Sequence, residues 1–359
     1  MKKKTILLTI LTATMVTACS NDEQQAEQAT PAQQREIRLS TNMLEANTRS
    51  YTATNLQSGD TVYVWTAMVN GSTGEATDYF KAWTLMANGV GGLTPQASGN
   101  TKLFPATNAL HFFALCGNFG LVTEGPREGE PTVEPEVDGL PTGGILHTVL
   151  NDQTTATAYY KSDLLYAVKP SQEPIAEAVQ LPFAHVLSRI QVVLIPGNGF
   201  NVSDLTAQTT SVSLLTLKNK VMFLPDSTKH APTNIERGAM LSFPSGTQTD
   251  DIAMTVSVSS SEDATPAAST VYADAIVVPQ TVAAGTPLIK VTYLGRDTYF
   301  KAPAGGMTFE SGKQYRIRLT ADRIGETYEL DGVTVENWSD AEEVDKWFDT
   351  LTDKKTTTN

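Results

Sequence analysis

The side chains with the greatest capacity for chemistry in this sequence are four histidines, at positions 111, 147, 185 and 230. Metal sites and catalytic couples need such residues at short, defined spacings from another histidine, a cysteine or a carboxylate. None of the four has that spacing, and no Gly-x-Ser-x-Gly turn surrounds the Ser188 that follows His185. We therefore expect no catalytic residue, no metal and no cofactor, and we interpret His185 as a residue of the core or of a domain interface.

Cys19 has a different chemistry, because it ends a segment with the composition of an export signal. Residues 2–4 are lysines, and residues 6–16 form an apolar run too short to span a bilayer. Residues 16–19 (Val-Thr-Ala-Cys) then match the site where bacterial lipoproteins are cleaved and the cysteine thiol receives a diacylglycerol. The pattern predicts a lipoprotein signal peptide over residues 1–19 and lipidation of Cys19, with about 0.8 kcal/mol of membrane affinity per buried methylene. The alternative is an ordinary secretory signal with an incidental cysteine.

Cys116 is the only other cysteine, so a chain processed at Cys19 has no intrachain disulfide. It ends the apolar run His-Phe-Phe-Ala-Leu-Cys at residues 111–116. A cysteine in such a run is more often a buried, inert thiol than a nucleophile. Stability must therefore come from the core and the hydrogen-bonded sheet.

The composition limits the class of partner. The chain has 359 residues, 40% of them hydrophobic, with 26 Lys and Arg against 39 Asp and Glu and a formal net charge of −13. Nucleic acids and anionic lipid surfaces attract basic patches. We expect a secreted surface protein with a sizeable core and no nucleic-acid partner.

The pattern along the chain is that of an all-β protein. Residues 20–35 are polar without an apolar period and predict a disordered tether. From Ile37 to Met43 apolar and polar residues alternate, as in a strand with one buried face. Further strands are expected at residues 61–69, 80–86, 109–115, 145–150, 164–168, 187–195, 211–217, 240–243, 252–258, 274–278, 288–293, 298–301, 314–320 and 333–338. Residues 341–351 are the only stretch expected to form a short helix.

Two polar stretches interrupt this pattern. Residues 126–144 are rich in Pro, Glu and Gly and form a long loop, which is often functional. The chain turns polar again at residues 169–181, and we place a domain boundary near residue 177. Antiparallel sandwiches are the expected architecture, since strands recur between turn signals without long helices.

Three groups of residues, in this order, resemble the fimbrillin family, the type V pilins of Bacteroidales and their lipoprotein relatives. The first is the lipoprotein signal with an early strand that ends in Thr48, Arg49 and Ser50. The second is Ser-Asp-Leu-Leu-Tyr-Ala at residues 162–167, followed by Leu-Pro-Phe-Ala-His-Val-Leu-Ser-Arg-Ile at residues 181–190. The third is Met-Thr-Phe-Glu-Ser-Gly-Lys-Gln-Tyr at residues 307–315 with the strand at residues 333–338.

The resemblance implies a fold and a processing step. It implies two tandem transthyretin-like β-sandwich domains, which we place at residues 36–176 and 177–359, the second with an acidic tail. An arginine- or lysine-specific protease would cut between Arg49 and Ser50 at the cell surface. The cut would remove the first strand and leave a groove where Ile37, Leu39 and Met43 had packed. A strand from a neighbouring subunit would then fill it and build a fimbria.

The donor of such a strand stays open at this stage. Family members use C-terminal strands, and the candidates here are Val333, Val335 and Trp338, or Trp347, Phe348 and Leu351. The alternative is that the first set is the last strand of the second domain and the second set a frayed helix.

The role of the whole chain also has alternatives. The leading hypothesis is a fimbrial subunit, as stalk, anchor or tip, on an outer-membrane lipoprotein that reaches the surface and enters a fimbria after processing. Its partners would be other fimbrial subunits, the membrane through the lipid, and the arginine-specific protease. The rival is a monomeric surface lipoprotein that binds a glycan or host ligand through residues 126–144 or through exposed aromatic side chains such as Trp83 and Trp338.

Overall fold

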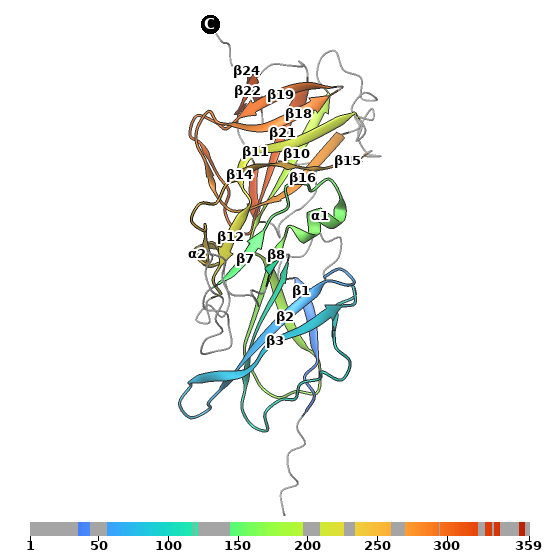
Figure 1. Ribbon diagram of the computed structural model, residues 1–359, viewed down its shortest axis with the longest axis vertical. Coiled ribbons are helices and arrows are strands. Elements are labelled where there is room, and N and C mark those ends of the chain that lie inside the picture. The colour runs from blue at the N-terminus through green and yellow to red at the C-terminus, as the bar shows by residue number, and fades with distance from the viewer. Residues whose placement is uncertain are drawn as a thin grey trace, which may run out of the picture. The chain divides into compact units, whose positions relative to one another are not determined.

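The computed structural model describes residues 35–43, 56–117, 119–120, 144–196, 209–225, 234–259, 270–293, 295–321, 327–331, 334–337 and 352–355. They lie within the unit Gln34–Asn359, and Figure 1 labels their strands and helices. The fold is all-β, as the alternating pattern predicts. Neither helix that the structure describes has the length and apolar content needed to cross a bilayer.

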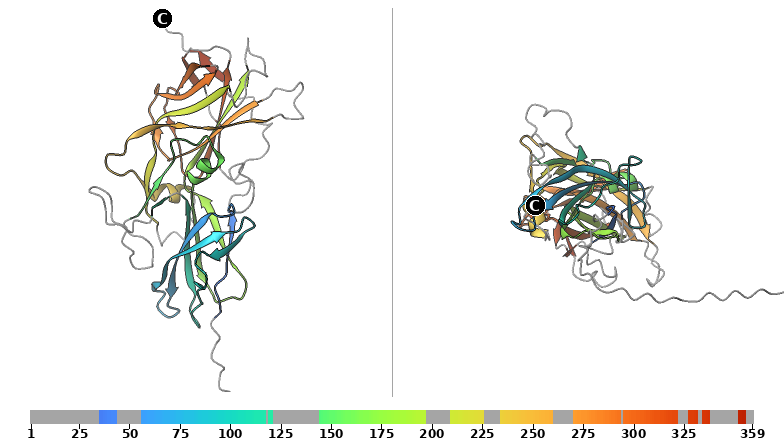
Figure 2. Two further views of the ribbon diagram at one scale, coloured as in Figure 1. Left: turned by 45° about the vertical axis from the view of Figure 1, so that its right-hand side comes forward. Right: turned by 90° about the horizontal axis from the view of Figure 1, so that it is seen from below.

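The first sheet curls into a closed barrel, whose blue-to-green strands can be followed from two further sides in Figure 2. Neighbouring strands in the barrel follow the order β1-β4-β3-β2-β5-β8-β9, and the pairing of β9 with β1 closes it. Their bounds are β1 Leu39–Met43, β2 Thr61–Val69, β3 Ala76–Ala87, β4 Gly92–Pro95, β5 Leu110–Gly117, β8 Leu164–Gln172 and β9 Val179–His185.

Two larger sheets follow from β10 onward. One has the order β15-β16-β10-β21-β23, with bounds β10 Ser188–Pro196, β15 Thr255–Ser259, β16 Thr270–Val277, β21 Lys313–Ala321 and β23 Thr334–Asn337. The other has the order β14-β11-β18-β19-β22-β24, with bounds β11 Thr210–Lys218, β14 Thr249–Ala253, β18 Pro287–Tyr293, β19 Arg296–Lys301, β22 Thr327–Asp331 and β24 Thr352–Lys355.

Short elements complete the described part of the chain. A small sheet has the order β13-β12-β7-β6, with bounds β6 Phe119–Gly120, β7 Ile145–Thr148, β12 Lys220–Phe223 and β13 Leu241–Ser242. A two-stranded sheet joins β17 Thr281–Val282 to β20 Met307–Thr308. The helices are α1 Ala156–Lys161 and α2 Asn234–Ala239.

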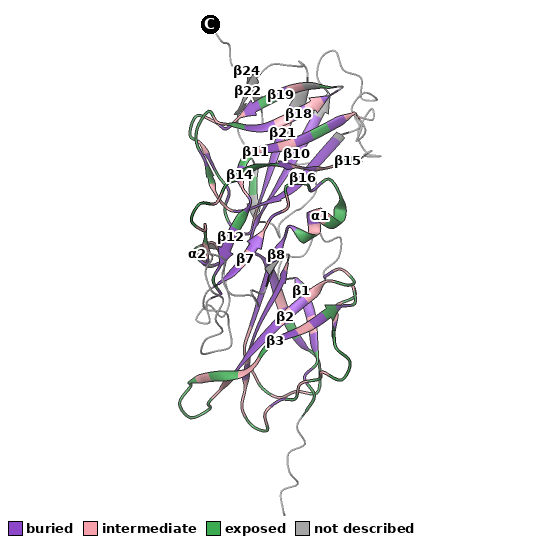
Figure 3. Ribbon diagram, in the orientation of Figure 1, coloured by how far each residue is buried: buried purple, intermediate pink, exposed green. Residues whose placement is uncertain are grey.

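The buried side chains form two clusters, which appear as purple segments in Figure 3. One fills the barrel and includes Phe112, Ala114 and Cys116 of β5. The other includes Phe113 and Leu115 of the same strand and continues into the larger sheets. The strand β5 is therefore buried on both faces, which explains why its sequence is a nearly continuous apolar run and not an alternating one.

Two expectations need correction. The strand expected at residues 252–258 is broken at the buried Met254, where the chain passes from β14 to β15 in another sheet. The helices α1 and α2 form where none was expected, because each has six residues, too few to show an apolar period. The helix expected at residues 341–351 lies outside the described residues.

The change of sheet along the chain comes later than residue 177. Residues 179–185 form β9 in the barrel, and the five-stranded sheet begins with β10 at Ser188. In addition, β7 from the first part of the chain pairs with β12 from the second. The division into two tandem domains stays a prediction.

Candidate functional site

The strand β1 holds the position that closes the barrel. It pairs antiparallel with β4, with Leu39 opposite Leu93, and parallel with β9, with Leu39 opposite Val179. The Thr41 N–H donates to the Gly91 carbonyl at 2.7 Å, and the Arg38 carbonyl accepts from the Val179 N–H at 2.8 Å. The strand therefore satisfies main-chain groups on two neighbours at once.

One face of β1 points into the barrel core. Ile37, Leu39, Thr41 and Met43 are all buried, at 3%, 3%, 5% and 4% exposure, while Asn42 between them is exposed. Successive side chains of a strand point to opposite faces, so the alternating sequence produces this arrangement directly. The three apolar side chains belong to the cluster that fills the barrel.

The segment before β1 extends the same interface. The Ile37 N–H donates to the Lys102 carbonyl at 2.8 Å, and the Arg35 carbonyl accepts from the Phe104 N–H at 2.8 Å. The Arg35 guanidinium donates to the Pro174 carbonyl at 3.0 Å. Residues 35–43 thus form one continuous contact strip along the barrel.

Removal of this strip would change the chemistry of the barrel surface. The β4 and β9 edges would each present unpaired N–H and C=O groups, and the apolar core between them would meet water. Both changes are unfavourable, and both are reversed when another strand takes the place of β1. The strip and its two neighbours are the candidate functional site, which we call the β1 slot.

The remaining predicted site residues are only partly described. Cys19, Arg49, Ser50, Val333, Trp338, Trp347, Phe348 and Leu351 lie outside the described residues. Val335 lies on β23, which pairs antiparallel with β21 at the edge of its sheet, and its side chain is 50% exposed.

One of the two aromatic side chains named for the alternative ligand-binding surface is buried. Trp83 was expected to be exposed, but it is 3% exposed, and its indole N–H donates to the Asn100 carbonyl at 2.9 Å. The alternation of β3 places it on the core face, beside Leu85. Most of the loop at residues 126–144 lies outside the described residues.

The histidine of the second motif has a partner from the same motif. His185 is fully buried on β9, and its Nδ1 lies 2.7 Å from Oδ2 of Asp163, whose other oxygen accepts from the Leu164 N–H. Sequence reasoning placed His185 in the core or at a domain interface but missed Asp163. The available signal was that residues 162–167 and 181–190 form two halves of one motif, each with a polar side chain suited to pair with the other.

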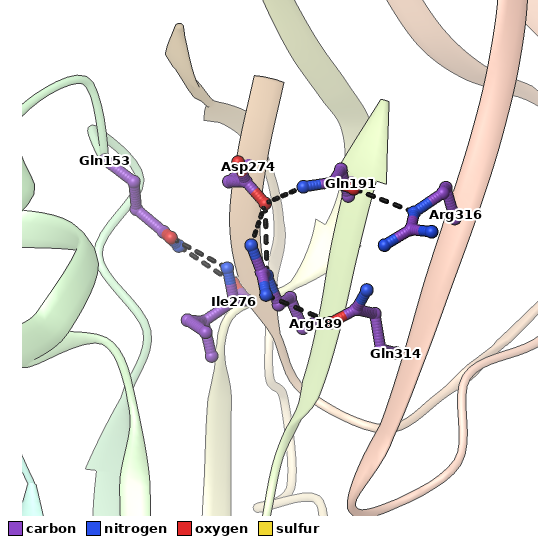
Figure 4. A network of polar contacts seen from close by, with 7 residues as sticks. All are labelled: Gln153, Arg189, Gln191, Asp274, Ile276, Gln314 and Arg316. Carbon is purple, nitrogen blue, oxygen red and sulfur yellow. Dashed lines mark hydrogen bonds and ion pairs between the residues drawn. The ribbon is translucent and has the colours of Figure 1, made fainter. Parts of the chain in front are cut away.

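A second buried polar group, shown in Figure 4, crosses three strands of the five-stranded sheet. Arg189 of β10 donates to Asp274 of β16 at 2.6 Å and to Gln314 of β21 at 3.0 Å. Gln191 also donates to Asp274 and accepts from Arg316 at 2.9 Å. Burial is the largest single effect on the pKa of Arg189 and would lower it, but Asp274 and Tyr159 together outweigh burial and the pKa is raised. Arg189 therefore stays charged.

Other reactive groups have structural surroundings. Cys116 is a buried free thiol whose pKa is raised by burial, which makes it a poor nucleophile. Within the described ranges, no three His, Cys, Asp or Glu side chains form a group suited to a metal ion.

Comparison with known proteins places these features in a family. A family model described as fimbrillin-like matches residues 48–338. No curated protein matches the sequence.

Solved structures with a similar fold include a candidate cell adhesion protein of Bacteroides ovatus, with TM-score 0.55 and 15% identity, covering 85% of this chain and 98% of that one. Another candidate cell adhesion protein, from Bacteroides uniformis, has TM-score 0.51 and 18% identity and covers 84% of this chain and 98% of that one. At these identities the similarity applies to the fold alone.

Proposed function

The chain belongs to the fimbrillin-like family, and from this premise we propose that it is a structural subunit of a cell-surface fimbria, assembled by strand exchange after cleavage between Arg49 and Ser50. The family consists of fimbrial and adhesive surface proteins and not of enzymes. In this proposal Cys19 is lipidated, and the precursor reaches the cell surface as an outer-membrane lipoprotein. Its partners are then the neighbouring subunits and the arginine-specific protease.

The observation that carries the proposal is the position of β1 at the closure of the barrel. Cleavage between Arg49 and Ser50 would break the covalent link between β1 and β2. The strand β1 would then be held only by its hydrogen bonds and side-chain contacts with the barrel. Ile37, Leu39 and Met43 contribute roughly 5–9 kcal/mol at about 1.5–3 kcal/mol for each buried side chain, as an upper estimate. A strand from another subunit recovers this free energy, so exchange can proceed without a large net loss.

A contact of this type does not close on itself. The slot on one subunit and the donor strand on another are different surfaces, and such heterologous contacts generate filaments. The donor of this chain is the C-terminal segment, with Val333, Val335 and Trp338 or with Trp347, Phe348 and Leu351. The exposed edge position of β23 supports the first set.

The test is the N-terminal residue of the protein recovered from cells. We expect the chain in sheared surface filaments to begin at Ser50, whereas the Arg49→Ala variant remains in the membrane fraction with lipidated Cys19. Arg38→Ala is the matched control, because the Arg38 side chain is 66% exposed and lies in the same N-terminal segment. Filaments that contain a chain beginning at Cys19 would contradict cleavage and would indicate an anchor that keeps β1.

A further inference from the structure

The β1 slot has a fixed strand direction and four positions whose side chains point inward. We propose that it accepts a strand from another kind of subunit, not from a second copy of this chain, and that this strand carries large apolar, large apolar, small and large apolar side chains at alternate residues. The inference rests on the proposed function, because it identifies the partner of the same slot. Ile37, Leu39, Thr41 and Met43 are the template for this pattern.

The register of β1 is defined on both sides. On β9 the partners run in parallel from Leu39 opposite Val179 to Met43 opposite Phe183, without a shift. On β4, Leu39 lies opposite Leu93 and Ser40 opposite Gly92. A slip by one residue would turn the apolar side chains outward, so only slips by two residues keep the faces correct.

Thr41 distinguishes the true register from a slip by two residues. It is the one inward position of residues 37–43 that carries a small, polar side chain, and it is 5% exposed. A slipped strand would place a large side chain in the Thr41 position and the threonine hydroxyl in a position built for Leu39 or Met43. Close-packed interiors resist both changes, because the larger side chain strains its neighbours and the smaller one leaves a cavity.

The C-terminal segments of this chain do not reproduce the pattern. Residues 333, 335, 337 and 339 are Val, Val, Asn and Ser, and residues 344, 346, 348 and 350 are Val, Lys, Phe and Thr. Every other frame across these segments also brings a polar or charged residue to a large apolar position. An unpaired charge in such a position is strongly unfavourable. The strand that fills this slot therefore comes from another kind of subunit, while the C-terminus of this chain serves a different slot.

Peptide exchange into the nicked full-length chain tests the selection. A site for a specific protease is inserted between Arg49 and Ser50, and the protein is cut and mixed with a labelled peptide of residues 35–43. A peptide with Leu39 and Thr41 exchanged is the matched control, because its composition, charge and apolar content are identical. Peptides of residues 331–339 and 344–352 represent a second copy of this chain.

We expect the peptide of residues 35–43 to bind at least about tenfold more tightly than the other three, measured by fluorescence anisotropy. Equal binding of the exchanged peptide would overturn the role of Thr41. Tight binding of either C-terminal peptide, or oligomers of the nicked chain alone, would overturn the different-subunit assignment. The inserted cut makes this result independent of natural cleavage. Selective binding without Ser50 in filaments would reject only the proposed function, and Ser50 in filaments with unselective binding would reject only the inference.

Discussion

His147 illustrates how a polar side chain behaves at the centre of this fold. It lies fully buried on β7, and its Nε2–H donates to the Ser162 carbonyl at 2.9 Å. The carbonyl can only accept, so the proton resides on Nε2. Burial lowers the pKa of His147 to about 4, and the Ser162 carbonyl and the Asp163 charge offset only part of that effect.

Acidification should therefore weaken the fold through His147. His147 takes up a proton near pH 6.5 in the unfolded state and only near pH 4 in the folded state. Its titration therefore takes nothing from the free energy of unfolding above pH 6.5 and lowers it as the pH falls. We expect a loss of about 1.4 kcal/mol per pH unit between these values, in addition to the other titrating groups. Urea unfolding of the wild type and of His147→Gln between pH 4 and 8 measures it. Their difference should shrink at low pH, and parallel curves would contradict the assignment.

Polar residues of this kind are also where sequence reasoning was weakest. The alternating pattern identified Ile37, Leu39 and Met43 as inward-facing, because the strand period determines the face. It gave no reason to bury Arg189 or Asp274, whose pairing joins residues 85 positions apart. Such a pair becomes visible only when the strand order is known, and strand order is not encoded in any local period.

At the scale of elements, one strand edge is completed by a side chain and not by another strand. The strand β15 pairs with β16 only as far as Asp274. Beyond it, the side-chain amide of Gln153 takes the place of a strand, since its Nε2 donates to the Ile276 carbonyl at 2.8 Å and its Oε1 accepts from the Ile276 N–H at 2.9 Å. The Gln153 N–H also donates to Ala253 of β14, so one residue joins two sheets.

Replacement of this amide should expose its importance. Gln153→Met keeps the volume but leaves two buried main-chain groups of Ile276 unpaired, at about 1–3 kcal/mol each. We expect the free energy of unfolding to fall by about 2–5 kcal/mol in chemical denaturation. Gln248→Met, at an exposed position, is the control and should change stability little. A loss below that of the control would show that water replaces the amide.

Element boundaries separate what a pattern can and cannot predict. The strand at residues 61–69 was predicted with its observed ends, because turn residues flank a long run of β-branched, aromatic and other apolar residues. The helix α1 was missed: its start depends on the Thr155 hydroxyl, which accepts from the Ala158 N–H at 3.2 Å, a single contact with no periodic signature.

At the scale of the whole molecule, β1 is the first strand of the described residues, and the barrel closes only because β1 pairs with two strands from later parts of the chain. By register, Leu39 lies opposite Leu93 of β4 and opposite Val179 of β9, which are 54 and 140 positions later in the chain. The all-β class followed from the sequence, but a closed barrel depends on these distant pairings.

Closure of the barrel also predicts which strands exchange their amide hydrogens faster after cleavage. After cleavage between Arg49 and Ser50, amides of β4 and β9 should exchange with deuterium faster than in the intact chain, because β1 is then free to dissociate. The strands β10 and β16, which pair with each other and not with β1, should keep their protection. Mass spectrometry of peptides from each strand provides the measurement. Uniform acceleration in all four strands would instead indicate global destabilisation.

The parallel pairing of β1 with β9 has a mechanical consequence. A strand in this slot is paired with β9 over residues 39–43 and with β4 at Leu39 and Ser40, so tension along its axis loads those hydrogen bonds together and not one after another. Two residues separate the end of β9 from the start of β10. Force applied to the inserted strand is therefore transmitted through β9 directly to β10, the central strand of the five-stranded sheet. This geometry resists mechanical separation.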